Sequence, residues 1–290
     1  MTLEAPIIAA PALREDDVAR LADLLRGRRV AVLTGAGCST ESGIPDYRGP
    51  ETRRRARNPV KYRQFLKDAE ARRRYWARAV VGWGRFANKH PNPAHHALAQ
   101  LEQEGIVTGI VTQNVDRLHH AAGSLRVIEL HGALAEVRCM GCDAISGREA
   151  IQRRLLERNP DWAALHAEMA PDGDAELPAS VVSRFEVTDC VACGGFLKPN
   201  VVFFGESVPR AVVEASYRLV DGADALLVVG SSLAVFSGYR FVKRAAARGQ
   251  PVAQVNLGES RGDAHAAVSV QGRAGEVLPR LATLLSASSR

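Results

Sequence analysis

Residues 30–48 read VAVLTGAGCSTESGIPDYR, and this stretch decides the fold of the chain. Its apolar start is typical of a buried parallel strand. Gly35 and Gly37 follow the strand, and glycine lets the backbone turn tightly and approach a pyrophosphate. Ser39 and Thr40 then offer hydroxyl and N–H donors at the expected start of a helix, whose dipole favours anions. The stretch therefore predicts a loop that binds the phosphates of a dinucleotide.

This loop departs from the fingerprint of the usual dehydrogenases. Thr40 replaces the third glycine, and Arg53-Arg54-Arg55 stand about twenty residues after the loop begins, where an acidic residue normally binds the ribose. These departures disfavour hydride transfer. A Gly-x-Gly after a strand can also be only a tight turn. The adjacent acid, aromatic ring and guanidinium of Asp46-Tyr47-Arg48 favour contacts with a cofactor, because packing alone does not explain that combination.

Length and composition indicate a globular chain with a full core. The 290 residues are 46% apolar, enough for one large domain or for a large and a small one. No apolar run is long enough to span a membrane, and the acidic residues near the N-terminus do not fit a secretory signal or a transit peptide. We therefore expect a cytoplasmic protein without a membrane partner.

The formal charge of +6 is concentrated in one segment. Residues 48–78 contain twelve Lys or Arg and only three acidic residues. Such a segment can be a solvated helical face, or it can bind an acidic small molecule, a cofactor phosphate or nucleic acid. Because it directly follows the glycine loop, a role near the cofactor or an acidic substrate is favoured, and nucleic acid is the minor alternative.

Short apolar runs separated by helical patterns predict a doubly wound parallel sheet, with strands at 29–34, 107–111, 126–130, 225–229 and 252–256. Two insertions interrupt this pattern. Residues 53–104 are largely helical in pattern, with a break at 91–93, and the sheet rhythm stops between Leu130 and Leu197. We therefore predict a large domain from 1–52, 105–134 and 198–290, and a small domain from the insertions 53–104 and 135–197. Residues 171–174 are expected to form a surface loop.

Four of the five cysteines form two pairs, Cys139-x2-Cys142 and Cys190-x2-Cys193. Thiolates at this spacing supply half of a tetrahedral zinc shell from one turn, and the two pairs together complete it. Disulfides or unrelated thiols are the alternative, which a chain without a secretory signal disfavours. A shell of four thiolates has no place for a reactive water, so the zinc is expected to be structural. Cys38 is expected to be a small buried residue.

Polar side chains follow two neighbouring strands of the expected sheet. Gln113, Asn114 and Asp116 come after one strand, and His131 comes after the next. Ligands bind at the carboxyl edge of open parallel sheets, so these residues are expected beside the glycine loop. Asp116 with the local backbone can bind a carboxamide such as that of nicotinamide. His131 is the best candidate for a general base, whereas the other histidines lie on helical or loop segments and are interpreted as structural.

Taken together, these blocks resemble the signature blocks of the sirtuins over nearly the whole chain. The further blocks that carry the resemblance are Lys198 to Glu206 (KPNVVFFGE), Val229 to Leu233 (VGSSL) and Val255 to Gly258 (VNLG). Tyr75 to Arg78 (YWAR) and the PNPAH at 91–95 look most like the class II branch, which includes mitochondrial and bacterial members. The family implies a Rossmann-type domain with a small zinc-ribbon and helical module.

The resemblance also implies an activity and a set of site residues. Sirtuins are NAD-dependent protein-lysine deacylases that consume NAD and leave free lysine, nicotinamide and acylated ADP-ribose. His131 is then the base, with Asn114 as a second catalytic residue. Carried onto this sequence, the NAD contacts are Gly35, Ala36, Gly37, Ser39, Thr40, Asp46, Tyr47, Arg48, Gln113, Asn114, Asp116, Gly230, Ser231, Ser232, Asn256, Leu257, Gly258 and Ala274.

The resemblance places the substrate between two extended segments, to which the peptide adds as a strand. They contain Val202, Phe204, Gly205 and Glu206 on one side and Leu233 on the other. Tyr75 and Arg78 are one helical turn apart and resemble the pair that binds the carboxylate of acidic acyl chains in acyl-selective sirtuins. We therefore expect acidic chains to be removed at least as well as acetyl. An arginine on a solvated face is the alternative interpretation.

Two departures from the family pattern are visible. Cys38 replaces the more usual isoleucine, and residues 143–189 form a long arm between the cysteine pairs. Neither departure touches the expected catalytic residues. Two other functions stay open: an enzyme that cleaves NAD or transfers ADP-ribose on the same fold, and a zinc-ribbon protein that binds nucleic acid and senses NAD.

Overall fold

A computed structural model describes residues 13–47, 59–165 and 177–287 of the chain. The larger part is a six-stranded parallel sheet in the order β3-β2-β1-β7-β8-β9. Counted along the chain within this sheet, the order is 3-2-1-4-5-6, which is that of doubly wound dinucleotide-binding folds. The predicted fold class is confirmed. The strands are β1 Val30–Thr34, β2 Val107–Thr112, β3 Val127–Glu129, β7 Ala225–Val229, β8 Val252–Asn256 and β9 Ala266–Gln271.

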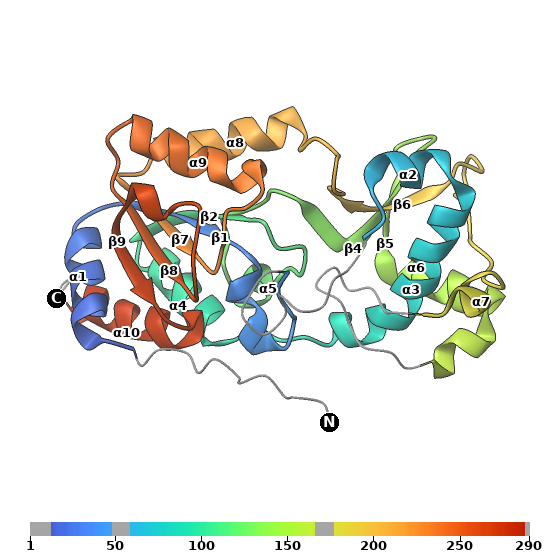
Figure 1. The fold of residues 1–290 in the computed structure, drawn as a ribbon, viewed down its shortest axis with the longest axis horizontal. Coiled ribbons are helices and arrows are strands. Elements are labelled where there is room, and N and C mark those ends of the chain that lie inside the picture. The colour runs from blue at the N-terminus through green and yellow to red at the C-terminus, as the bar shows by residue number, and fades with distance from the viewer. Residues whose placement is uncertain (1–12, 48–58, 166–176, 288–290) are drawn as a thin grey trace, which may run out of the picture.

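Helices cover both faces of this sheet (Figure 1). One face carries α1 (Glu15–Leu25), α4 (Pro93–Gln103) and α10 (Ala274–Ser286), and the other carries α8 (Arg210–Asp221) and α9 (Phe236–Ala247). Alternate residues of β1 therefore enter different cores: Val30 and Val32 pack with the first group, and Ala31 and Leu33 with the second. Burial on both faces explains why the strands read as unbroken apolar runs.

The smaller part lies at the other end of the long axis (Figure 1). The sheet rhythm does not simply stop between Leu130 and Leu197, because a second, antiparallel sheet in the order β5-β4-β6 forms there. Phe65, Trp162 and Phe185 pack in its core. Its elements are β4 Gly132–Cys139, β5 Ile145–Gly147, β6 Leu197–Val201, α2 Tyr62–Lys67, α3 Ala69–Ala87, α6 Arg148–Arg158, η3 Pro160–Ala164 and α7 Ala179–Val182.

Helix α4 corrects the division predicted from the sequence. The expected break at 91–93 is present, because α3 ends at Ala87 and α4 begins at Pro93, with Asn92 capping its N-terminus. However, Ala94 and Leu98 of α4 pack in the same core as the parallel sheet. The domain boundary that we propose therefore moves α4 from the insertion 53–104 to the large domain.

Four short elements complete the fold: η1 Ala36–Cys38, η2 Thr40–Ser42, α5 Leu118–Ala121 and η4 Asp263–His265. Arg48 and residues 171–174, for which the sequence makes predictions, lie outside the described residues. Among the helices that the structure does describe, none combines the length and apolar character needed to cross a bilayer.

Candidate active site

One cavity lies where the strands β1, β2, β7 and β8 end. Its volume is about 1700 Å³, and the residues that follow each of these strands line it. Pockets for drug-sized ligands measure roughly 300–1,000 Å³, so this one can hold a larger cofactor together with part of a second molecule. The carboxyl edge of the sheet is where the sequence predicts the site.

The glycine loop after β1 approaches the end of β7 closely. The Gly35 N–H donates to Val229 O at 3.0 Å, and the Gly37 N–H donates to Gly230 O at 2.9 Å. A Cβ at Gly37 would lie 2.9 Å from Gly230 Cα, so only glycine fits. The helix expected after this loop is absent. The chain instead forms the short 3₁₀ turns η1 and η2, so the prediction of a helix dipole at Ser39 and Thr40 is wrong.

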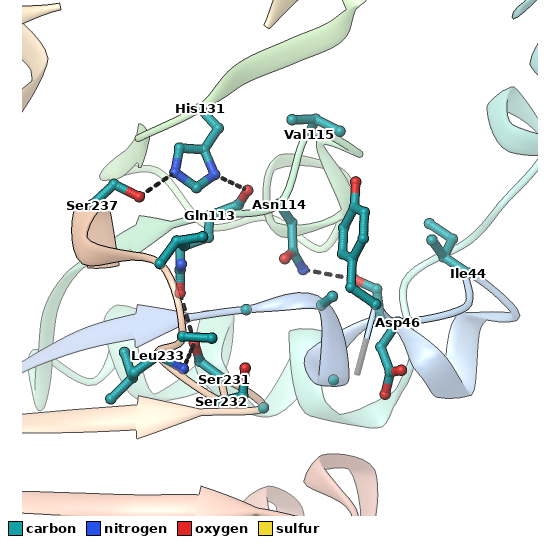
Figure 2. A pocket seen from close by; sticks show the side chains of 18 of the residues that line it. Ile44, Asp46, Gln113, Asn114, Val115, His131, Ser231, Ser232, Leu233 and Ser237 are labelled. Atoms are coloured by element: carbon teal, nitrogen blue, oxygen red, sulfur yellow. Dashed lines mark hydrogen bonds between the residues drawn. The ribbon is translucent and has the colours of Figure 1, made fainter. Parts of the chain in front are cut away.

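The predicted NAD contacts gather around this cavity. Arg48 lies outside the described residues, and every other predicted contact lines the cavity: Gly35, Ala36, Gly37, Ser39, Thr40, Asp46, Tyr47, Gln113, Asn114, Asp116, Gly230, Ser231, Ser232, Asn256, Leu257, Gly258 and Ala274. They come from segments separated by most of the chain, and the sheet brings them together. Gln113 and Ser231 also contact each other, because the Ser231 hydroxyl donates to Gln113 Oε1 at 2.7 Å (Figure 2).

Ser39 joins the two polar residues that follow β2. Its hydroxyl donates to Asp116 Oδ2 at 2.7 Å and accepts from Asn114 Nδ2 at 3.0 Å. The other carboxylate oxygen of Asp116 accepts from the Leu118 N–H at 2.9 Å. Burial raises the pKa of Asp116, which these hydrogen bonds partly oppose. Each oxygen can accept a second bond, so the carboxamide contact predicted for Asp116 stays a prediction.

His131 is held at both ring nitrogens (Figure 2). Nδ1 lies 2.9 Å from the backbone oxygen of Gln113, and Nε2 lies 2.9 Å from Ser237 Oγ. A carbonyl oxygen only accepts, so Nδ1 carries the proton and Nε2 keeps its lone pair in the neutral ring. Burial lowers the pKa of His131, and the charge of Arg240 lowers it further. The neutral ring therefore presents a basic nitrogen to the cavity near pH 7.

Ser237 and Arg240 are among the residues of this site that sequence reasoning misses. Both line the cavity from the first turns of α9. They directly follow the VGSSL block, and one helical turn separates them, so they share a face of the helix. Their positions one helical turn apart, directly after this block, are the sequence signal that could have predicted both residues.

The remaining buried histidines, His95 and His119, lie outside the cavity, and their structural role stays a prediction. Burial lowers the pKa of His95 to about 4 and places that of His119 well below its ordinary value. His119 Nε2 lies 2.9 Å from Thr34 Oγ1 inside the sheet, and neither ring lines the cavity. Cys38 beside them is fully buried, and burial raises the pKa of its thiol, so it stays protonated.

The two segments predicted to bind substrate line the cavity, and each contains a turn. Phe204, Gly205 and Glu206 form a turn in which the Glu206 N–H donates to Phe203 O at 2.9 Å. Gly205 has a φ of 83° and Leu233 has a φ of 54°, so the expected extended conformation is interrupted at both places. Binding of the peptide between these segments stays a prediction. Val202 and Leu233 also line the cavity.

A buried ion pair holds the first of these segments. Lys198 Nζ lies 2.9 Å from Glu206 Oε2, and the lysine side chain is only 6% exposed. Glu206 Oε2 also accepts from the Phe203 N–H at 2.8 Å. The pair ties the turn to strand β6 and so fixes one wall of the cavity.

Of the two residues predicted to determine the preferred acyl group, only one lies in the cavity wall. Tyr75 lines the cavity and packs edge-to-face on Phe65, with ring centroids 5.6 Å apart. Arg78 is half-buried and is not one of the cavity-lining residues. The structure thus brings Tyr75, but not Arg78, to the cavity.

The four paired cysteines converge at the outer part of the small module. Their sulfur atoms all lie within 4.8 Å of one another, with Cys139 and Cys193 Sγ atoms 3.4 Å apart. The Gly141 N–H donates to Cys139 Sγ at 3.3 Å, and backbone N–H groups lower the pKa of this thiol to about 6. All five cysteines are free thiols. Four converging thiols, one already favoured as thiolate, fit a closed tetrahedral zinc site.

Comparisons with known proteins agree with this geometry. The model of the Sir2 family matches residues 35–237. A protein of Bordetella bronchiseptica called NAD-dependent protein deacetylase is 53% identical over 266 residues, which are 91% of this chain and 97% of that protein. NAD-dependent protein deacetylase 1 of Mycobacterium avium is 53% identical over 271 residues, 92% of this chain and 95% of that protein. A solved structure described as "Sir2-p53 peptide-NAD+" has a TM-score of 0.71 at 29% identity and covers 93% of this chain and 98% of its own. The chain therefore belongs to the Sir2 family.

Proposed function

We propose that this chain removes acyl groups from lysine side chains of proteins, consumes NAD and releases nicotinamide. The observation that carries the proposal is His131: its Nδ1–H is fixed on Gln113 O, and its basic Nε2 lies in the cavity that the glycine loop also lines. The bacterial relatives named above are called NAD-dependent protein deacetylases, which supports the same activity.

The residues around the cavity suit NAD. Gly35 and Gly37 let the loop pack tightly against the end of β7, since a Cβ at either position would clash there and both N–H groups already donate to backbone oxygens of Val229 and Gly230. The loop backbone, without side chains at these two positions, lines the cavity where a pyrophosphate can approach. Ser231, Ser232 and Asn256, at the ends of β7 and β8, supply further polar groups to the cavity. When bound, NAD supplies a ribose carbon that the acyl oxygen of the modified lysine attacks as nicotinamide leaves.

His131 acts as the general base in this proposal. Its Nε2 accepts a proton from a hydroxyl of the ribose, and Gln113 O holds the ring in the tautomer that keeps Nε2 free. Ser237 now donates to Nε2, so its hydroxyl must give way to the ribose. Positioning and one base suffice, because nicotinamide is already a cationic leaving group.

Zinc has a structural part in this proposal. The four thiolates close the coordination shell, which leaves no open position for water or substrate. All four cysteines, Cys139, Cys142, Cys190 and Cys193, would coordinate the zinc ion. The ion would therefore hold the two ends of the arm 143–189 together.

The test is release of nicotinamide from NAD with an acetylated peptide, followed by mass spectrometry of both products. The matched control is the same peptide with free lysine. We expect release only with the acetylated peptide, together with acylated ADP-ribose. Equal release with both peptides would identify an NAD-cleaving enzyme, and binding of nucleic acid without release would favour the NAD sensor.

We also propose that acidic acyl chains are removed at least as well as acetyl, with Tyr75 and Arg78 as the carboxylate site. Tyr75 supports this by its place in the cavity wall. Arg78 lies one helical turn from it on α3 but does not line the cavity, so the role of Arg78 rests on the family resemblance and on this spacing. Arg78→Met should remove the advantage of a glutaryl over an acetyl chain. Arg74→Met, a half-buried arginine on the same helix, is the matched control. Equal losses on both chains would refute this site but not the deacylase activity.

The cytoplasmic location and the protein targets stay predictions. Acylated lysines on proteins are the expected partners, and nucleic acid is not required by this mechanism.

A further inference from the structure

Arg240 is a cation in the cavity wall that the mechanism does not use. It lines the cavity together with Ser237, which lies one helical turn before it and contacts His131 Nε2. The guanidinium is therefore close to the reaction centre, and its charge lowers the pKa of His131.

Among the residues that the structure describes, no carboxylate forms an ion pair with this guanidinium. Its Nε atom is buried and has no hydrogen-bond partner in the described part of the chain. Its Cζ lies 5.2 Å from the centroid of the Phe236 ring, which positions the planar group without using its N–H donors. A buried N–H without a partner is unfavourable, so the site is more stable when a ligand supplies an acceptor.

Two of the carboxylates that line the cavity are already engaged. Glu206 pairs with Lys198, and both oxygens of Asp116 accept hydrogen bonds. The first turn of α9 has no side-chain cap, so its N–H groups add positive potential beside Arg240. This corner of the cavity therefore favours an anion.

We propose that Arg240 binds a carboxylate carried by the acylated substrate. The proposal rests on the deacylase function proposed above. A carboxylate suits a planar guanidinium, because it can accept two parallel N–H bonds. Two parts of a substrate can carry it: an acidic side chain next to the acyl-lysine, or the end of an acidic acyl chain. The neighbouring Phe236 is 54% exposed, so this corner reaches the rim of the cavity, which favours the acidic side chain.

The test compares three peptides: acetyl-lysine with neutral neighbours, acetyl-lysine with acidic neighbours, and glutaryl-lysine with neutral neighbours. For each peptide, the dissociation constant is measured by fluorescence anisotropy and kcat/KM by nicotinamide release. Arg240→Gln should reduce the advantage of acidic over neutral neighbours about tenfold, as expected when a hydrogen bond to a charged group is lost. Arg240→Lys should restore part of it. Lys243→Gln, which removes an exposed cation outside the cavity on the same helix, should leave the ratio within about twofold.

Each result decides the proposal. A loss confined to the glutaryl peptide would keep the carboxylate site and assign it to the acyl chain. Unchanged ratios for both acidic peptides, even with a shifted pH profile, would overturn it. A higher KM for NAD with all three peptides would also overturn it, because Arg240 would then bind the cofactor. If no peptide is deacylated, the function proposed above fails, whereas the ratio of dissociation constants still tests Arg240.

Discussion

His131→Ala should nearly abolish deacylation while the enzyme still binds NAD. The imidazole supplies the only predicted base, and its pKa is lowered below 6.5 by burial. Around neutral pH and above, His131 is therefore already neutral and able to accept a proton, so the substitution removes a base that is in use. Loss of a general base lowers the rate by about 10²–10⁴-fold, which corresponds to about 3–5 kcal/mol of transition-state stabilisation.

The same substitution has a cost in stability that the assay must separate from chemistry. Gln113 O and the Ser237 hydroxyl both lose a partner at 2.9 Å, and a buried polar group left without a partner costs about 1–3 kcal/mol. We therefore measure the unfolding midpoint and NAD affinity of the variant first, and kcat/KM at a temperature well below that midpoint.

His120→Ala is the matched control. His120 is 44% exposed on α5 and does not line the cavity, so its removal should change kcat/KM by no more than about twofold. In the wild-type enzyme, kcat/KM should fall as the pH drops through a pKa below 6.5, because protonation of His131 removes the base. Turnover by folded His131→Ala within about tenfold of the wild type would refute the assignment of the base.

The other predictions concern the metal, the loop and the buried ion pair. Cys139→Ser should release zinc and lower the melting temperature, because metal binding is coupled to folding; retention of both metal and melting temperature would contradict the site. Gly37→Ala should raise the KM for NAD, since its Cβ would lie 2.9 Å from Gly230 Cα, and an unchanged KM would exclude this loop from cofactor binding. Lys198→Met should lower the free energy of unfolding, measured by chemical denaturation, by about 3–5 kcal/mol, because it leaves the Glu206 carboxylate without its partner. The double variant Lys198→Met with Glu206→Gln should recover part of that loss. No recovery would argue against the ion pair.

Buried parallel strands and the edge strand β3 could be predicted from the sequence, but the other edge strand, β9, could not. β1 and β7 are buried at every residue and therefore read as continuous apolar runs. β9 (Ala266–Gln271) lies at the edge of the sheet. Its exposed residues alternate with half-buried or buried ones, and only Val270 is fully buried. Its pattern does not differ from that of a surface loop.

The members of the site could be predicted more fully than its conformation. Residues at the ends of parallel strands converge wherever the strand order places those ends together, so a list of strand ends predicts the cavity lining. The backbone at Leu233 has a φ of 54°, which a leucine rarely adopts, and no local residue preference indicates it. Arg240 was missed for another reason: an arginine on an amphipathic helix normally indicates a solvated face.

The departure of the glycine loop from the dehydrogenase fingerprint now has a physical explanation. The third glycine of that fingerprint allows a helix to pack closely on its strand. Here the chain leaves β1 through two 3₁₀ turns, so no helix requires that glycine, and the Thr40 hydroxyl instead donates to Gly37 O at 3.1 Å. The close contact in this chain is instead between the glycine loop and Gly230, where a Cβ would lie 2.3 Å from the Cys38 nitrogen. The glycine that completes the packing of this loop is therefore contributed by the end of β7, far along the chain, where a search of the loop sequence alone cannot find it.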